Sequence, residues 1–181
     1  MKRRWLLAGF ALVVVCAVAV VVYFSSRTIG QAAPRNGRPL ELSDFAAVDT
    51  AKDFRIQLEG KFAPVKQELG TPNEVTTLSH GGGGALTVYQ AVFPELTIQY
   101  AEPDGSILAI SVRGKGFRTP RGIEVGSPER AVEQAYGAPT YRFQGNLQYV
   151  LAPSEQIDRY QLTFVISGSR VSTIWAFVPV Q

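Results

Sequence analysis

Val132-Glu-Gln-Ala-Tyr-Gly-Ala-Pro139 decides the fold, because the chain carries the same phrase earlier as Val65-Lys-Gln-Glu-Leu-Gly-Thr-Pro72, at an offset of 67 residues. In both copies an apolar/polar pattern at helical spacing ends at a glycine suited to the left-handed position that follows a helix. A proline two residues later prevents the helix from continuing. The sequence therefore predicts two short helices that belong to an internal repeat.

The match extends on both sides of this phrase. Upstream, Ile56-Gln-Leu58 corresponds to Ile123-Glu-Val125, and downstream the run from Ile107 to Ile110 mirrors the run from Val171 to Ile174. Alternating segments separated by turn residues predict about four antiparallel strands after each helix. The strands are expected at residues 74–78, 86–89, 96–100 and 107–113 in the first copy, and at 141–143, 147–151, 160–166 and 171–178 in the second.

These elements predict an α+β fold. We expect an N-terminal transmembrane helix, followed by two tandem helix-plus-four-strand repeats that form a two-layer antiparallel sheet with the helices on one face. The predicted parts are a cytoplasmic stub and signal anchor at residues 1–24, a linker at 25–39, a first repeat at 40–118 and a second at 119–181. Ser43 is a possible N-cap for a further helix before the first repeat.

The N-terminal segment predicts attachment to a membrane. Residues 5–24 contain no charged side chain, and as a helix they would span about 30 Å, the thickness of the hydrocarbon core. The basic residues Lys2, Arg3 and Arg4 predict a cytoplasmic N-terminus and a folded part outside the cell membrane. A cleaved signal peptide is the alternative, with a possible cleavage site at Ala17-Val-Ala19, although the apolar run continues beyond that point.

Composition argues against several classes of function. The net charge of +3 is accounted for by the three basic residues before the apolar run, so the basic isoelectric point is no evidence for binding of nucleic acid. The one cysteine, Cys16, lies within that run, and the one histidine, His80, has no second histidine or nucleophile motif to work with. We therefore expect no cofactor, no metal and no catalytic site.

Two groups of side chains are candidate contacts with a protein partner. Ile174 and Ala176 match apolar positions of the first copy. This predicts that the residues alternating with them along the strand point away from the helices, unless a bulge inverts the phase. The side chains predicted for that face are Tyr89, Gln99, Thr163, Thr173 and Trp175. The second group is the basic run between the copies, either a solvated loop or a docking point for an anionic partner, which comprises Arg113, Lys115, Arg118 and Arg121.

The phrase Gly126-Ser-Pro-Glu-Arg-Ala-Val-Glu-Gln-Ala-Tyr-Gly-Ala-Pro139, with the return strand from Gly168 to Ile174, resembles the β-lactamase-inhibitor-protein-like family. This family includes the small lipoprotein of the outer-membrane β-barrel assembly machinery, and the resemblance covers roughly residues 54–178. It implies an extracytoplasmic domain that binds other proteins on a sheet surface without catalysis. The inhibitor's disulfides are absent here, and the lipoprotein's modified cysteine has no equivalent, so specific partners and contact residues are not implied.

Three hypotheses of function follow from the sequence. The first is a membrane-anchored, extracytoplasmic, non-enzymatic domain that binds an unknown protein on the sheet face away from its helices. The second is a cell-envelope hydrolase that acts through carboxylates such as Glu124 or Glu129, and it requires a pocket in which acids with shifted pKa values converge. The third is a sensor of a wall polymer or small ligand that uses the basic run.

Overall fold

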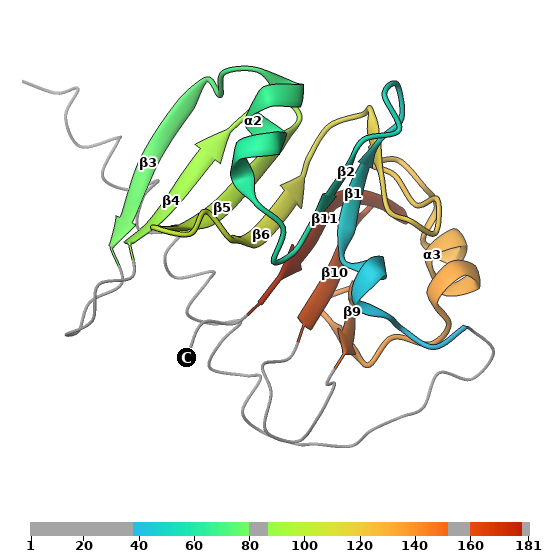
Figure 1. Cartoon of the computed structure of the whole chain (residues 1–181). Helices are drawn as coiled ribbons and strands as arrows, with labels where there is room; N and C mark the ends of the chain where they lie inside the picture. Colours follow the sequence, from blue (N-terminus) through green and yellow to red (C-terminus); the bar gives the residue numbers. More distant parts are fainter. Residues whose placement is uncertain (1–37, 80–86, 152–159, 179–181) are drawn as a thin grey trace, which may run out of the picture. The chain divides into compact units, whose positions relative to one another are not determined.

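The computed structural model describes residues 38–79, 87–151 and 160–178, which belong to one compact unit, Ala33–Gln181. Within these ranges the chain is mostly β (Figure 1). Eight strands form a large antiparallel sheet in the order β3-β4-β5-β6-β11-β10-β9-β8, and three strands form a small antiparallel sheet in the order β2-β1-β7.

The first half of the large sheet follows helix α2 (Phe62–Leu69) and contains β3 (Glu74–Ser79), β4 (Thr87–Val92), β5 (Leu96–Glu102) and β6 (Ile107–Val112). The second half follows helix α3 (Glu129–Tyr136) and contains β8 (Tyr141–Phe143), β9 (Asn146–Leu151), β10 (Tyr160–Ser167) and β11 (Arg170–Phe177). Both helices end where the repeated phrase predicts, at Gly70 with φ 85° and at Gly137 with φ 78°. These positive φ angles favour glycine.

The chain enters both helices through the same pattern of main-chain hydrogen bonds. In the first half the Glu59 amide donates to the Ile107 carbonyl at 2.8 Å, and in the second half the Gly126 amide donates to the Val171 carbonyl at 2.7 Å. The residues that begin the two helices bond in the same way to the turn that precedes the last strand of their half. Each helix is thus fixed to the final hairpin of its own half.

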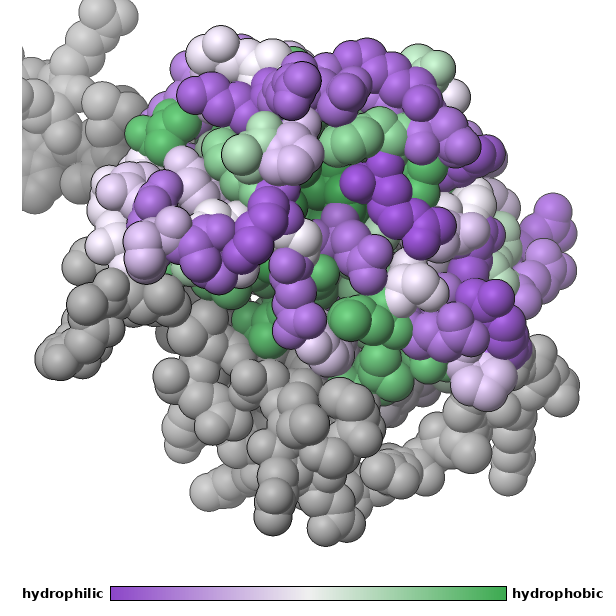
Figure 2. All heavy atoms as spheres, viewed as in Figure 1, coloured by the Kyte–Doolittle hydropathy of each residue, from purple (hydrophilic) through white to green (hydrophobic). Residues whose placement is uncertain are grey.

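The small sheet covers the middle of the large one. Its strands are β1 (Ala46–Asp49), β2 (Arg55–Gln57) and β7 (Phe117–Arg118), and β1 and β2 lie in front of β11 and β10 in Figure 1. Ala47 and Ile56 of the small sheet pack in the same core as Ile110 and Ile174 of the large one. Figure 2 shows that this layer, with α2 beside it, presents mainly hydrophilic side chains on its outer side.

The core therefore lies on one face of the large sheet. Aromatic rings join the helices to the strands beneath them. Phe62 of α2 stacks on Tyr100 with ring centroids 4.0 Å apart, and Tyr136 of α3 packs against Tyr149 and Phe164 at 5.3 and 5.2 Å. Buried aromatic pairs of this kind stabilise a fold beyond the area that they bury.

The predicted α+β class, with helices alone as the second layer, is wrong. The chain is mostly β, and its two α-helices of eight residues each flank a three-stranded sheet. The helix expected from Ser43 is only a 3₁₀ turn, Leu42–Asp44, after which the chain continues as β1. The segment between the copies, expected as a loop, contributes β7, which pairs with β1 through Val48 and Arg118.

The predicted transmembrane helix is no part of the fold that the structure describes. In the described ranges, no helix combines the length and the apolar character needed to cross a bilayer. Residues 5–24, on which that prediction was made, and the His80 loop lie outside these ranges.

Candidate interaction face

The two faces of the large sheet are assigned by the register of its strands. Ile98 pairs with Ile110 and Phe164 pairs with Ile174, and all four side chains belong to the core beneath α2, α3 and the small sheet. Residues directly opposite each other in antiparallel strands share a face, and successive residues alternate between faces. The positions between these core residues therefore lie on the opposite face, called the open face below.

Apart from Arg170, which pairs with Ser167 at the end of β11 and donates to the Gly126 carbonyl, the open face carries no charged side chain along the six described strands from β4 to β9. Its other residues are uncharged, and they are Val88, Gln90, Val92, Thr97, Gln99, Ala101, Ala109, Ser111, Thr173, Trp175, Phe177, Gln161, Thr163, Val165, Gln148 and Val150. Eleven of these residues are half-buried and the other five are buried, namely Val88, Thr97, Ala101, Ala109 and Gln161. Charged side chains are common on protein surfaces. Their depletion is typical of the centre of a protein–protein interface.

An aromatic pair stands in the middle of this face. Trp175 and Phe177 of β11 are half-buried, with ring centroids 5.0 Å apart and planes inclined at 37°. The neighbouring polar side chains bond to one another, since the Gln99 amide donates to Gln90 at 3.4 Å and the Gln148 amide donates to Gln161. The amides are thus held in place beside a large apolar surface.

Four of the five side chains predicted for this face lie on it: Gln99, Thr163, Thr173 and Trp175. Thr163 is directly opposite Trp175, so these two residues are neighbours across β10 and β11. The prediction for Tyr89 is wrong. It pairs with Tyr100, stacks on that ring at 5.5 Å, and therefore lies on the covered face beside α2.

The basic run does not form one exposed patch. Arg113, Lys115 and Arg118 are exposed, but only 8% of the Arg121 side chain is accessible, because it pairs with Asp44. A docking role for Arg121 is therefore wrong, since its guanidinium is already occupied within the fold.

Asp44 is the one buried carboxylate of the described chain, and no local sequence pattern indicates its partner. Burial would raise the pKa of Asp44, but hydrogen bonds from Arg121 and from the Glu41 amide outweigh that effect, and its pKa lies below the ordinary value. The guanidinium also lies over the Tyr136 ring, 4.8 Å from its centroid. This cluster ties the residues from Arg38 to Asp44 to the end of α3, and it engages the Asp44 carboxylate.

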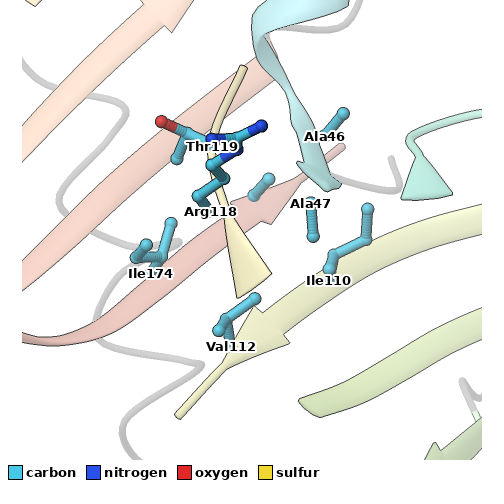
Figure 3. Close-up of a pocket in the computed structure, with 8 residues that line it drawn as sticks. Ala46, Ala47, Ile110, Val112, Arg118, Thr119 and Ile174 are labelled. Atoms are coloured by element: carbon cyan, nitrogen blue, oxygen red, sulfur yellow. The ribbon is translucent and has the colours of Figure 1, made fainter. Parts of the chain in front are cut away.

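A void between the small sheet and the large one is too small for a substrate. Figure 3 shows Ala47 of β1 and Thr119 facing Ile110 and Ile174 across it. Its volume is about 10 Å³, close to the space that one water molecule requires. The lining is almost entirely apolar, so this void offers no set of groups that could act on a ligand.

The carboxylates considered for hydrolysis do not converge. Glu124 is exposed, whereas Glu129 bonds to Arg142 of β8. In the ranges that the structure describes, no three His, Cys, Asp or Glu side chains are grouped as metal ligands. Asp104 accepts hydrogen bonds from the Ser106 hydroxyl and amide and from Lys61, which lower its pKa to about 2 and leave its carboxylate engaged in a turn.

Comparison of the chain with protein-family models, with curated proteins and with solved structures gives no match.

Proposed function

We propose that this chain is a membrane-attached, extracytoplasmic, non-enzymatic domain that binds another protein on its open face. The observation that carries the proposal is the scarcity of charge across six neighbouring strands around the half-buried pair Trp175 and Phe177. Tryptophan is the residue type most enriched among the contacts that dominate binding energy.

The composition of the open face favours a protein over a small ligand. A flat sheet surface offers many contacts of moderate strength, whereas a small molecule needs a concave site that surrounds it. The uncharged amides and hydroxyls, such as Gln99 and Thr163, supply hydrogen bonds without the desolvation cost of buried charge. The resemblance to β-lactamase-inhibitor-like proteins supports the same function on grounds of sequence.

The proposed location rests on the N-terminal sequence. Residues 5–24 would contact the bilayer, and the basic residues before them would keep the N-terminus in the cytoplasm. A chain with Cys16→Ala and Lys66→Cys tests this, because Lys66 is exposed on α2. An impermeant maleimide added outside intact cells or spheroplasts should label it, and labelling only after lysis would contradict the location.

Photo-crosslinking of the full chain in its native membrane tests the binding face. A photoreactive amino acid at Thr173 is expected to give a discrete adduct with one protein, whereas the same group at Lys66 is not. Trp175→Ala should weaken the interaction by about 30-fold, as expected for loss of a contact worth about 2 kcal/mol. Equal adducts from both positions, or an adduct that Trp175→Ala leaves unchanged, would exclude the open face as the binding surface.

A further inference from the structure

The large sheet ends in two edge strands of unequal character. β8 has three residues, and its Arg142 bonds to Glu129 and Glu133 of α3. β3 has six residues and, among the strands that the structure describes, pairs on one side only, with β4. A free edge of this length offers backbone donors and acceptors to a further strand.

β3 has few of the features by which proteins usually protect an edge. Its sequence Glu74-Val-Thr-Thr-Leu-Ser79 contains no proline and no lysine, and its register with β4 runs without a bulge. Val75, Thr76 and Thr77 are β-branched and exposed, with 50% of Val75 accessible. β-branched residues favour extended backbone, so this edge is a ready template for another strand.

We propose that β3 pairs antiparallel with β3 of a second copy of this chain, about a two-fold axis at Thr76. An axis perpendicular to the sheet keeps the two covered faces on one side. It places Val75 opposite Thr77 of the other copy, so that the exposed apolar side chain meets another β-branched residue. The two Glu74 carboxylates then lie opposite Leu78 residues, about 13 Å apart along the strands, which avoids repulsion at close range.

The charge of the chain favours a second copy as the occupant. Beyond Lys2, Arg3 and Arg4, acidic and basic residues are equal in number, so two copies carry no net repulsion. Two-fold pairing of identical surfaces is also the commonest form of assembly. This contact uses the edge of the sheet and leaves the open face available, so it is independent of the proposed function.

Disulfide trapping tests the pairing and its register. Thr76→Cys in the full chain with Cys16→Ala, purified in a mild detergent, should form a covalent dimer on mild oxidation. Opposite Cα atoms in antiparallel strands are about 4.5–5.5 Å apart, within the range that a disulfide spans. Val75→Cys alone should form no covalent dimer, but it should link to Thr77→Cys when the two variants are mixed. Failure of Thr76→Cys to link, or equal linking of Val75→Cys alone, would overturn the proposal.

Sedimentation of the same full-length chain provides a second measurement. We expect a monomer–dimer equilibrium whose dissociation constant rises at least tenfold in Val75→Lys. Gln134→Lys adds the same charge on exposed α3 and should have no effect, and circular dichroism should show both variants folded. A chain that stays monomeric at every concentration, or a dimer that Val75→Lys does not weaken, would also overturn the proposal.

Discussion

Arg121 and Asp44, separated by 77 residues in the sequence, form a paired ionic contact in which Nε lies 2.8 Å from Oδ1 and Nη2 lies 2.6 Å from Oδ2. The same guanidinium donates to the carbonyls of Arg38, Pro39 and Ala135 at 2.8–3.0 Å. One side chain therefore joins the start of the described chain to the end of α3. The charge is buried but surrounded by acceptors, which is the arrangement that makes burial of an arginine tolerable.

Loss of this pair should be costly. Arg121→Ala would leave the fully buried Asp44 carboxylate with only the exposed Arg38 guanidinium, 3.5 Å away, as its counter-ion. Removal of one partner from a buried pair typically costs about 3–5 kcal/mol. Urea unfolding should therefore show a free energy of unfolding lowered by this amount. Arg113→Ala, at an exposed position of the same segment, is the control and should change it by no more than about 0.5 kcal/mol.

The pH dependence of stability should report Asp44. Because its pKa in the folded protein lies below the ordinary value, the ionised carboxylate stabilises the fold above about pH 4, and this contribution is lost as the pH falls through the folded pKa. Unfolding measured from pH 7 to 2.5 should show the wild-type chain losing stability more steeply than Asp44→Asn below about pH 4. A difference between the two chains that does not vary with pH would refute this assignment. Asp104 also has a lowered pKa. Because Asp104 is present in both the wild-type and the Asp44→Asn chain, its contribution to the pH dependence cancels in the comparison.

Two neighbouring tyrosines should respond differently to loss of the hydroxyl. The Tyr149 hydroxyl donates to the Gly137 carbonyl at 2.9 Å, whereas the buried Tyr136 hydroxyl lies near the Thr119 hydroxyl and the Arg121 main chain without a hydrogen bond of good geometry to either. Tyr149→Phe should therefore lower the free energy of unfolding by about 1 kcal/mol. Tyr136→Phe should leave it unchanged or raise it slightly, because a buried unsatisfied group is removed. Equal losses in thermal or urea unfolding would contradict this distinction.

Tyr89 and Trp175 should separate stability from binding. Tyr89 stacks on Tyr100 beside α2, so Tyr89→Ala should lower the free energy of unfolding by about 1–2 kcal/mol and leave crosslinking to the partner intact. Trp175→Ala should have the opposite pattern, with weakened crosslinking and a smaller change in stability. If Tyr89→Ala weakened crosslinking as strongly as Trp175→Ala while remaining folded, the two faces would have been assigned incorrectly.

Local signals predicted the parts of this fold that depend on nearby residues. The ends of both helices follow from Gly70 and Gly137, because a positive φ after a helix is a property of one residue. The orientation of Trp175 follows from the apolar residues on either side of it, Ile174 and Ala176, which are both buried. In these cases the neighbouring sequence contains enough information to determine the structure.

The phase of β4 could not be predicted in this way. Val88 on the open face and Ala91 on the covered face are both buried, so the strand is apolar on both sides. Alternation therefore gives no indication of which side meets the helix, and Tyr89 was assigned to the wrong face. The register with β5 settles the question, but it is a contact between strands rather than a property of one strand.

The small sheet and the buried ion pair depend on contacts between distant segments. β7 has two residues and exists because Arg118 pairs with Val48, 70 positions earlier in the sequence. Asp44 is a suitable residue for the first turn of a helix, but its hydrogen bonds to Arg121 and Glu41 instead hold a single 3₁₀ turn. A single sequence does not indicate such partners, and the α+β prediction was wrong for this reason.

The pairing of β6 with β11 has a mechanical consequence. Four register pairs, from Val112 with Ile174 to Ala109 with Phe177, join the two halves through a continuous ladder of main-chain bonds. Opening and closing of one described half against the other would break that ladder, so the pairing of β6 with β11 opposes such a motion. A protein that binds the open face would therefore meet a preformed surface. Partners of different fit should differ mainly in their dissociation rates.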